Sequence, residues 1–299
     1  MSEYHISVLL HESIEGLDIS SDGKFVDVTF GAGGHARQII DRLSAKGHLY
    51  AFDQDEDALS NAPEDERFTL IPTNFRYMSK FLRLKGVAQV DGVLADLGVS
   101  SHQLDVPERG FSYRFDAPLD MRMNVRSDFS AADVVKNYSE QALVQIFSEY
   151  GEVRNAITLA KGIIAERNLA AIRTTFELNR VLDKYLIGPR MRYLSQVYQA
   201  LRMEVNDEIG ALKAMLTDGL KVLKPGGRFA VITFHSIEDR VVKNFFKSGS
   251  FEGQLIKDAF GNIERPFTLV NKKVIMASAK EQKSNARSRS AKLRVATKN

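Results

Sequence analysis

The stretch that decides the fold is FVDVTFGAGGH, residues 25–35. Its strand-like first half stops at the glycine turn of residues 31–34, and a helical pattern then continues to Leu43. Glycines let the backbone turn sharply at this point and approach a ligand at the N-terminus of a helix. This strand–turn–helix pattern predicts an α/β fold with a ligand site where the strand ends.

A second strand-like run, HLYAF at residues 48–52, is followed by Asp53, which lies twenty residues after Gly33. An acid at that distance can accept hydrogen bonds from the ribose hydroxyls of a nucleotide-like cofactor. Gly31, Gly33 and Ala36 also satisfy the G-x-G-x-x-G/A pattern of dinucleotide sites. Together these features predict an adenosine-containing cofactor, and they leave NAD as one alternative.

Two further features favour S-adenosylmethionine over NAD. Asp27 and Thr29 directly precede the glycines, and an acidic group there would repel a pyrophosphate but attract an ammonium group. The run VLKPGGRFAVITFHS, residues 222–236, reads as a helix end, a Pro-Gly-Gly turn and a buried strand. A Pro-Gly-Gly turn that leads into a late strand is typical of class I methyltransferases. We therefore predict a Rossmann-like class I methyltransferase sheet.

Composition excludes several kinds of chemistry. The chain has 299 residues, 44% of them hydrophobic, and no cysteine. It therefore has no disulfide, no thiolate ligand for a metal or iron–sulfur cluster, and no thiolate nucleophile for C5-cytosine methylation. If the substrate is a nucleic-acid base, an exocyclic amine or a ribose hydroxyl is favoured. The six-residue spacing of His5 and His11 suits neither a helical nor a strand metal pair, so we expect no metal.

No apolar run approaches the length of a membrane span, and the first residues lack the features of a signal peptide. We therefore expect a cytoplasmic protein. Residues 271–299 contain nine Lys and Arg residues but only one acid, Glu281, which gives them a net charge of +8 against −5 for the rest of the chain. This basic segment predicts contact with phosphate groups; a solvated terminus without a partner is the alternative. Strand-like runs at 274–276 and 293–295 predict that it is partly folded.

Strand and helix signals alternate through the first hundred residues, which predicts a parallel sheet with helices on both faces. After Asp96 the alternation stops, and helical patterns dominate until the sheet resumes near residue 228. Ser139 and Thr174 are candidate helix caps, and apolar residues at helical spacing predict one helix over 199–223. We predict one α/β domain, residues 1–108 and 210–299, with an inserted α-helical domain at 109–209.

The acidic residues Asp27, Asp53 and Asp96 all end predicted strands. Because ligands in open α/β sheets bind outside the carboxyl ends of the strands, we expect these three carboxylates to line one edge. His235 ends a later strand at the same edge. Phe75 follows the third strand and could pack against an adenine ring, although an ordinary core role is nearly as compatible with its position.

Four polar residues follow Asp96 closely and are expected to face the same site: Ser100, Ser101, His102 and Gln103. Each one alone is more often a residue that stabilises a turn. The two acids after His235, Glu238 and Asp239, are explained by their place in the first turn of a helix, where they offset the helix dipole.

With these residues placed, the sequence resembles the bacterial 16S rRNA cytosine-N4 methyltransferase family. The stretches that carry the resemblance run from residue 5 to residue 295: HISVLLHE, DVTFGAGGHA, AFDQDEDAL, DGVLADLGVSSHQLDVPERGFSYRFDAPLDMRM, YGE, QALRMEVNDEI, LKPGGRFAVITFHSIEDRVVK and NARSRSAKLRV. The chain lacks the N/D/S-P-P-Y/F/W motif of the enzymes that methylate amino groups in DNA.

The resemblance implies methyl transfer from S-adenosylmethionine to the exocyclic N4 of a cytidine in the decoding centre. It implies 16S rRNA as partner, within the small ribosomal subunit, and it is compatible with a homodimer. The helical insertion would recognise the substrate. The positions that match cofactor-contacting residues of the family are Gly33, Gly34, His35, Asp53, Phe75, Asp96 and Gln103.

A cytosine amine is a poor nucleophile, so the enzyme must align it and accept hydrogen bonds from its protons. Our hypothesis is that Asp96 or a neighbouring carbonyl is that acceptor, that Ser101 and His102 position the base, and that His235 receives a proton or orients the loop. The rival functions are a methyltransferase for another RNA, a protein or a small molecule, an NAD-dependent dehydrogenase, and a non-enzymatic RNA-binding factor.

Overall fold

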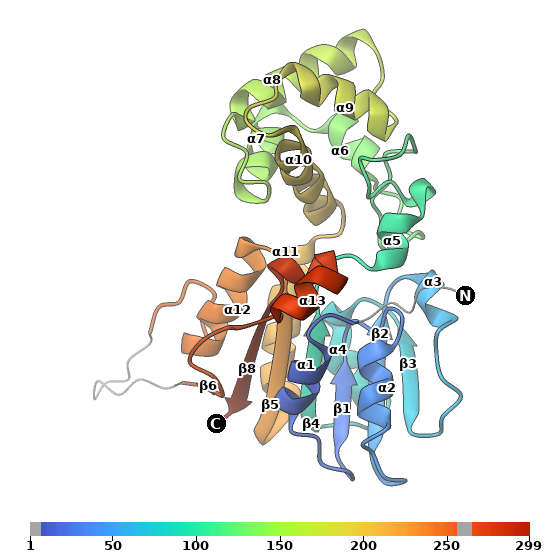
Figure 1. Cartoon of the computed structure of the whole chain (residues 1–299), viewed down its shortest axis with the longest axis vertical. Helices are drawn as coiled ribbons and strands as arrows, with labels where there is room; N and C mark the ends of the chain where they lie inside the picture. The colour runs from blue at the N-terminus through green and yellow to red at the C-terminus, as the bar shows by residue number, and fades with distance from the viewer. Residues whose placement is uncertain (1–6, 256–264) are drawn as a thin grey trace. The chain divides into compact units, whose positions relative to one another are not determined.

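The computed structural model describes residues 7–255 and 265–299, which form two compact units (Figure 1). The sheet unit runs to Gly98 and resumes at Ile209, and the helical unit spans Val99–Glu208. The chain thus leaves the sheet unit ten residues before the expected boundary at residue 108 and returns one residue before the expected 210. The earlier boundary follows from packing, because Val99 and Leu104 pack against the hydrophobic core of the helical unit.

The sheet has the strand order β3-β2-β1-β4-β5-β8-β6, with β7 paired to β8. The first five strands in this order are parallel, whereas β8 is antiparallel to β5. The strands are β1 Lys24–Asp27, β2 His48–Asp53, β3 Phe68–Pro72, β4 Val90–Asp96, β5 Leu223–Thr233, β6 Phe267–Leu269, β7 Ile275–Met276 and β8 Lys292–Lys298. The predicted class I methyltransferase sheet is confirmed, as are the two short strands predicted in the basic segment.

Helices cover both faces of this sheet, so its central strands are buried on both sides and read as nearly continuous apolar runs. One hydrophobic cluster joins the sheet to α1 and α2, and a second joins it to α4, α11 and α12. The helices of this unit are α1 Leu10–Leu17, α2 Gly34–Ile40, α3 Glu56–Leu59, α4 Met78–Leu84, α11 Glu208–Val222, α12 Ser236–Ser248 and α13 Ala279–Ser284. A 3₁₀ helix, η1 Phe75–Tyr77, precedes α4, and another, η3 Ala286–Ser290, follows α13.

Close packing of α11 on β5 leaves no room for a side chain at Gly219. A Cβ atom there would lie 2.3 Å from Cε1 of Phe229, whose ring is fully buried. We therefore expect Gly219→Ala to destabilise the protein by about 1–3 kcal/mol, as overpacking does, although Ala normally stabilises a helix relative to Gly. Urea unfolding measures the change. In the double variant with Phe229→Leu, the loss of stability should be smaller than the sum of the losses in the two single variants. Simple additivity of the two losses would contradict this packing explanation.

The prediction of a single helix over residues 199–223 is wrong. The structure has two helices, α10 Arg190–Val205 and α11, with a break at Asn206 and Asp207. Asp207 has a left-handed backbone (φ 44°), and the amide Nδ2 of Asn206 donates to the carbonyl oxygens of Met121 and Arg202, each at 2.8 Å. The apolar spacing continued across the break because each helix buries its own stripe in a different core.

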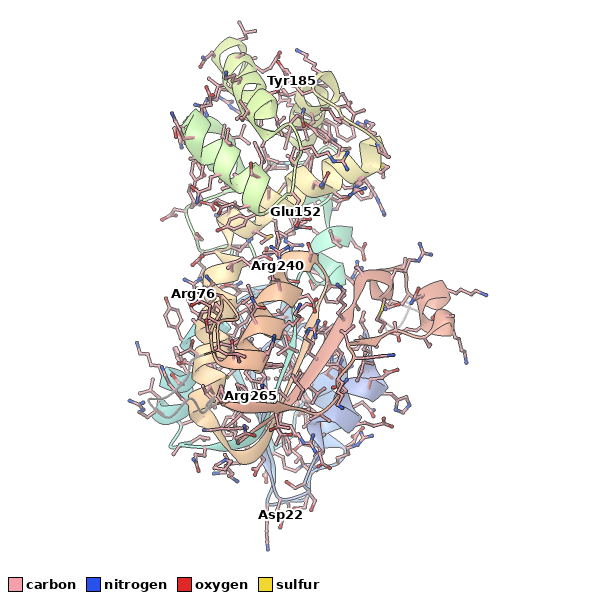
Figure 2. The ribbon with its side chains drawn as sticks, turned by 90° about the vertical axis from the view of Figure 1, so that its left-hand side faces the viewer. Asp22, Arg76, Glu152, Tyr185, Arg240 and Arg265 are labelled. Carbon is pink, nitrogen blue, oxygen red and sulfur yellow. The ribbon has the colours of Figure 1, made fainter. Side chains whose placement is uncertain are left out.

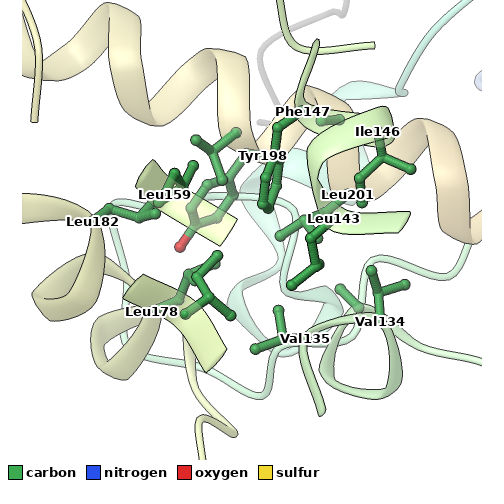
Figure 3. Packing of buried hydrophobic residues seen from close by; sticks show 14 of the residues in the cluster. Val134, Val135, Leu143, Ile146, Phe147, Leu159, Leu178, Leu182, Tyr198 and Leu201 are labelled. Atoms are coloured by element: carbon green, nitrogen blue, oxygen red, sulfur yellow. The ribbon is translucent and has the colours of Figure 1, made fainter. Parts of the chain in front are cut away.

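The helical unit packs its helices around one apolar core (Figure 3). Ser139 and Thr174 cap α7 and α9 as predicted, Thr174 in a capping box with Glu177. Tyr198 is buried in this core, and its hydroxyl lies 3.0 Å from Oδ1 of Asn179. The elements are α5 Ser101–Asp105, η2 Pro107–Arg109, α6 Ala131–Asn137, α7 Glu140–Glu149, α8 Ala156–Leu169, α9 Thr175–Lys184 and α10.

In the part of the chain that the structure describes, none of the helices combines the length and the apolarity needed to cross a membrane.

Candidate active site

Three carboxylates lie at one edge of the sheet, where parallel strands end. Asp27 ends β1, Asp53 ends β2 and Asp96 ends β4. The strands are adjacent and parallel in the order β2-β1-β4. The structure thus places the three acids at a shared edge, as expected from the sequence, while their roles toward a cofactor stay predictions.

The glycine turn after β1 is held in a conformation that favours glycine. Gly31 and Gly33 have φ angles of 52° and 76°. The amide of Gly31 donates to Oδ2 of Asp53 (2.8 Å), and the side chain of Asn61 donates to the carbonyl oxygen of Gly31 (3.1 Å). A Cβ atom at Gly34 would lie 2.0 Å from Oγ of Ser7. Hydrogen bonds to Asp53 and from Asn61 hold the turn, and Ser7 packs closely against it. No sequence pattern pointed to Asn61 or Ser7.

Two buried carboxylate oxygens at this edge have no hydrogen-bond partner among the described residues: Oδ2 of Asp27 and Oδ1 of Asp96. The other oxygen of Asp27 accepts from the amide of Thr29 (3.0 Å). The hydroxyl of Thr29 in turn accepts from the amide of Asp96 (2.6 Å), which ties the ends of β1 and β4 together. Because a buried acceptor without a partner is costly, these two oxygens indicate a place for a donor group from a ligand.

The electrostatics of this edge favour a positively charged ligand. Burial raises the pKa of Asp27 to about 7, and the charge of Asp53 adds to this effect while hydrogen bonds from Thr29 oppose it. Burial, followed by the charges of Asp27 and Glu238, raises the pKa of Asp96 well above its usual value. A cation bound between these groups would favour their charged forms. The proximity of Glu238 to Asp96 was missed by the sequence analysis, which explained Glu238 only by the helix dipole.

His35 lies in the first turn of α2, with its imidazole ring near Asp96. It is buried, and burial lowers the pKa of its imidazole to about 4. Its Nε2 lies 3.2 Å from the carbonyl oxygen of Val8, so in the neutral ring Nε2 carries the proton and donates. Its Nδ1 lies 3.8 Å from Oδ2 of Asp96. Neutral His35 therefore presents a lone pair, not a charge, to Asp96.

His235 lies directly after β5 and is the N-cap residue of α12. Its Nδ1 accepts from the amide of Glu238 (3.4 Å), and Glu238 accepts from the amide of Phe234 (3.0 Å). The Nε2 atom of His235 lies 3.2 Å from Oε1 of Glu238. These contacts give His235 a local structural role as well as a place at the carboxyl edge, and its proposed part in proton transfer stays a prediction.

Phe75 begins η1 after β3 and is half-buried against the core on the α4 side. The preceding Asn74 caps this turn by accepting from the amide of Arg76 (2.9 Å). Phe75 is partly exposed, and its contact with an adenine ring stays a prediction.

Three predicted site residues belong to the helical unit, so the structure does not group them with the carboxylates of the sheet unit. Ser101 and His102 lie in the first turn of α5. Gln103 is buried and completes a capping box with Ser100. Its side-chain Oε1 accepts from the backbone amide of Ser100 (3.0 Å), and its backbone amide donates to Oγ of Ser100 (3.1 Å). The local role of Gln103 is therefore that of a cap. His5 lies outside the described residues.

The residues at the sheet edge fit S-adenosylmethionine. This cofactor carries an ammonium group and a positive sulfonium, and the unpartnered carboxylate oxygens of Asp27 and Asp96 can accept from or pair with such groups. The carboxylate of Asp53 accepts from three backbone amides, of Gly31, Asp55 and Gln54. Because a carboxylate offers about four lone-pair sites, it can still accept from a ribose hydroxyl. A pyrophosphate would instead meet repulsion.

The raised pKa of Asp27 predicts that cofactor affinity depends on pH. Above about pH 7 the carboxylate is charged and attracts an ammonium group; below that value it takes up a proton that binding must release. We expect the dissociation constant of S-adenosylmethionine to rise by up to about tenfold for each pH unit below 7. Calorimetric titration from pH 5.5 to 8.5 would test this, and a flat profile would contradict it.

Comparison with known proteins identifies the family of this chain. The family model of the MraW methylase family matches residues 2–299. The Ribosomal RNA small subunit methyltransferase H of Flavobacterium johnsoniae is 56% identical over 99% of this chain and 98% of its own length. The protein of the same name from Parabacteroides distasonis is 53% identical over 99% and 97%. An rRNA methylase structure from Streptococcus thermophilus matches with a TM-score of 0.43 and 13% identity over 98% of both chains, which is too remote to support an inference. The chain belongs to the MraW methylase family.

Proposed function

We propose that this S-adenosylmethionine-dependent methyltransferase modifies the exocyclic N4 of one cytidine in the decoding centre of 16S rRNA. Relatives that are 53–56% identical over nearly the whole chain carry a name that specifies ribosomal RNA of the small subunit. The absence of cysteine supports an amine target, because the covalent route to C5 of cytosine needs a thiolate.

The observation that carries the proposed chemistry is the state of Asp96. Its Oδ1 is buried without a partner among the described residues, and its pKa is raised by burial, then by Asp27 and Glu238. A carboxylate with a raised pKa is a stronger base than an exposed one. It can therefore accept a hydrogen bond, and then the proton, from an amine whose lone pair is delocalised into a cytosine ring.

When bound, the cofactor would supply a methyl group on positively charged sulfur, and transfer of that methyl to N4 would leave the electron pair of the broken carbon–sulfur bond on sulfur. The amine loses one proton, for which Asp96 is the proposed acceptor. Asp27 would hold the ammonium end and Asp53 the ribose, which fixes the direction from which the methyl group is presented.

The helical unit is the proposed substrate-recognition domain. Within it, Ser101 and His102 are proposed to position the base, since they follow Asp96 closely in the chain. His235 is proposed to orient the loop after β5, a role compatible with its position as the N-cap of α12. An assembled small subunit as substrate, a cytoplasmic location and a homodimer belong to the same proposal.

The test is incubation of purified protein and labelled S-adenosylmethionine with small-subunit RNA from a strain that lacks the corresponding enzyme. Nuclease digestion and mass spectrometry should detect a single new N4-methylcytidine. Isolated 30S-type particles and protein-free RNA would be compared as substrates. Binding of the cofactor without methylation of either RNA sample would leave the family assignment standing and would overturn this substrate.

A further inference from the structure

The C-terminal segment contains a group of basic side chains that the fold itself does not use. Of the nine basic residues in 271–299, five have internal partners. Arg294 forms a two-pronged ion pair with Asp239 (2.7 and 3.1 Å), which Lys292 joins at 3.5 Å, and Lys298 donates to the carbonyl oxygen of Leu223 (2.7 Å). The Nε atom of Arg289 donates to the carbonyl oxygen of Gln282 (3.3 Å), and Arg287 also has an internal contact. The four remaining lysines, which we call the basic arm, are Lys272, Lys273, Lys280 and Lys283.

The side chains of the arm are available to a partner. All four of these lysines are exposed. The side chains of Lys273, Lys280 and Lys283 make no ion pair or hydrogen bond with the residues that the structure describes. Figure 2 shows the segment with α13 at the right of the sheet unit, with side chains directed away from the ribbon. The positive charge of the arm is therefore not neutralised within the described protein.

Strand direction places Lys280 and Lys283, the two lysines of the arm that lie on α13, at the edge that carries the candidate active site. Strand β8 is antiparallel to β5, and its first residue, Lys292, is opposite Thr233 at the carboxyl end of β5. Ile232, one residue earlier, is opposite Asp96. The elements that lead directly into β8, α13 and η3, must therefore lie at the carboxyl edge, as Figure 1 shows for α13.

One hydrogen bond fixes the arm at this position. Glu281, the only acid in residues 271–299, accepts from the backbone amide of Leu9 through Oε1 (2.9 Å). The neighbouring carbonyl of Val8 accepts from His35, whose other ring nitrogen faces Asp96. The arm is thus attached to the same short segment that supports His35, next to the candidate site.

We propose that the basic arm binds phosphate groups of the RNA strand that carries the target nucleotide. This inference rests on the proposed function and adds the surface that holds the substrate. The carboxyl edge contains Asp27, Asp53, Asp96 and Glu238, and the chain outside residues 271–299 has a net charge of −5. An RNA strand that approaches this edge would be repelled without a compensating positive surface, and the arm supplies one beside it.

The test compares two triple variants with equal charge change. The first is Lys273→Gln with Lys280→Gln and Lys283→Gln, on the arm. The matched control is Lys24→Gln with Lys46→Gln and Lys85→Gln, three exposed lysines near the amino ends of the strands, at the opposite edge. The probe is unmodified 16S rRNA transcribed in vitro, and its dissociation constant is measured over a range of salt concentrations.

For the arm variant we expect the slope of log K against log salt to become less negative by about 2–3. Each lost phosphate contact reduces the magnitude of this slope by roughly 0.7–0.9. We expect affinity at physiological salt to fall at least tenfold, with S-adenosylmethionine affinity unchanged. A Lys→Arg triple at the same positions should keep the wild-type slope, which separates charge from folding. Equal slopes for the arm and control variants would overturn the inference. Absence of methylation by the wild type would overturn only the proposed function, since the binding comparison does not depend on turnover.

Discussion

Asp27→Asn should weaken the binding of S-adenosylmethionine by at least about 100-fold at pH 8. The substitution leaves Oδ1 in place to accept from the amide of Thr29, but it replaces the unpartnered carboxylate oxygen with a neutral amide donor. An ammonium group would then lose its charged partner in a buried site, where removal of one member of an ion pair costs about 3–5 kcal/mol. Calorimetric titration of both proteins measures the change.

The same substitution should make the ligand-free protein more stable at pH 8. The pKa of Asp27 is about 7 in the folded protein against 3.8 for an aspartate in water, so the folded state binds the proton more tightly. Folding therefore becomes less favourable as pH rises from about 4 to 7, and the full penalty applies above 7. Asn carries no charge, so urea unfolding at pH 8 should show a gain of up to about 4 kcal/mol, a gain that disappears near pH 4.

The control for both halves of this prediction is Asp41→Asn, an exposed carboxylate at the end of α2. It should change neither cofactor affinity nor its pH dependence. If Asp27→Asn bound the cofactor normally, the ammonium would have to lie elsewhere. If it destabilised the protein at pH 8, the unpartnered oxygen would instead be satisfied in the ligand-free state.

Asp96→Asn should lower turnover by about 10²–10⁴-fold, the usual contribution of a positioned general base. The amide keeps the shape of the side chain but cannot take the amine proton. Cofactor affinity should change far less than turnover, because the ammonium partner, Asp27, is unchanged. Single-turnover methylation of the RNA with saturating cofactor measures the chemical step, and equilibrium binding measures the affinity.

The pH profile gives an independent check on Asp96. In the wild type the single-turnover rate should rise with pH as the raised pKa of Asp96 is passed, and Asp96→Asn should lose this limb. Asp91→Asn is a suitable control, since Asp91 lies at the other end of the same strand and pairs with Lys224 (2.7 Å). A variant at Asp96 that turned over at the wild-type rate would refute the acceptor role.

Local patterns in the sequence were sufficient for most of the fold. The strands around residues 25–30, 48–52 and 91–96 were recognisable because parallel strands buried on both faces are apolar throughout. The placement of Asp27, Asp53 and Asp96 at one edge followed from the parallel order alone, since each residue directly ends a strand. The helix caps at Ser139 and Thr174 were equally local, because each needs only residues within one turn.

The break between α10 and α11 depends on contacts that no local pattern contains. The apolar spacing runs through Asn206 and Asp207 unbroken, and one of the contacts that hold the turn there, to the carbonyl of Met121, comes from 85 positions away. The contact between Glu281 and Leu9 spans 272 positions. Such pairs become predictable only when the topology of the sheet is known.

The sequence by itself determined the sheet, the glycine turn and the identity of the acidic and basic groups, because these depend on residue type and short-range spacing. The tertiary structure decided which of those groups are buried and which lie beside one another. Burial gives Asp27 and Asp96 their raised pKa values and their unpartnered oxygens, and the antiparallel entry of β8 brings the basic arm to their edge. Both effects arise from packing between distant segments, where desolvation and charge proximity are set.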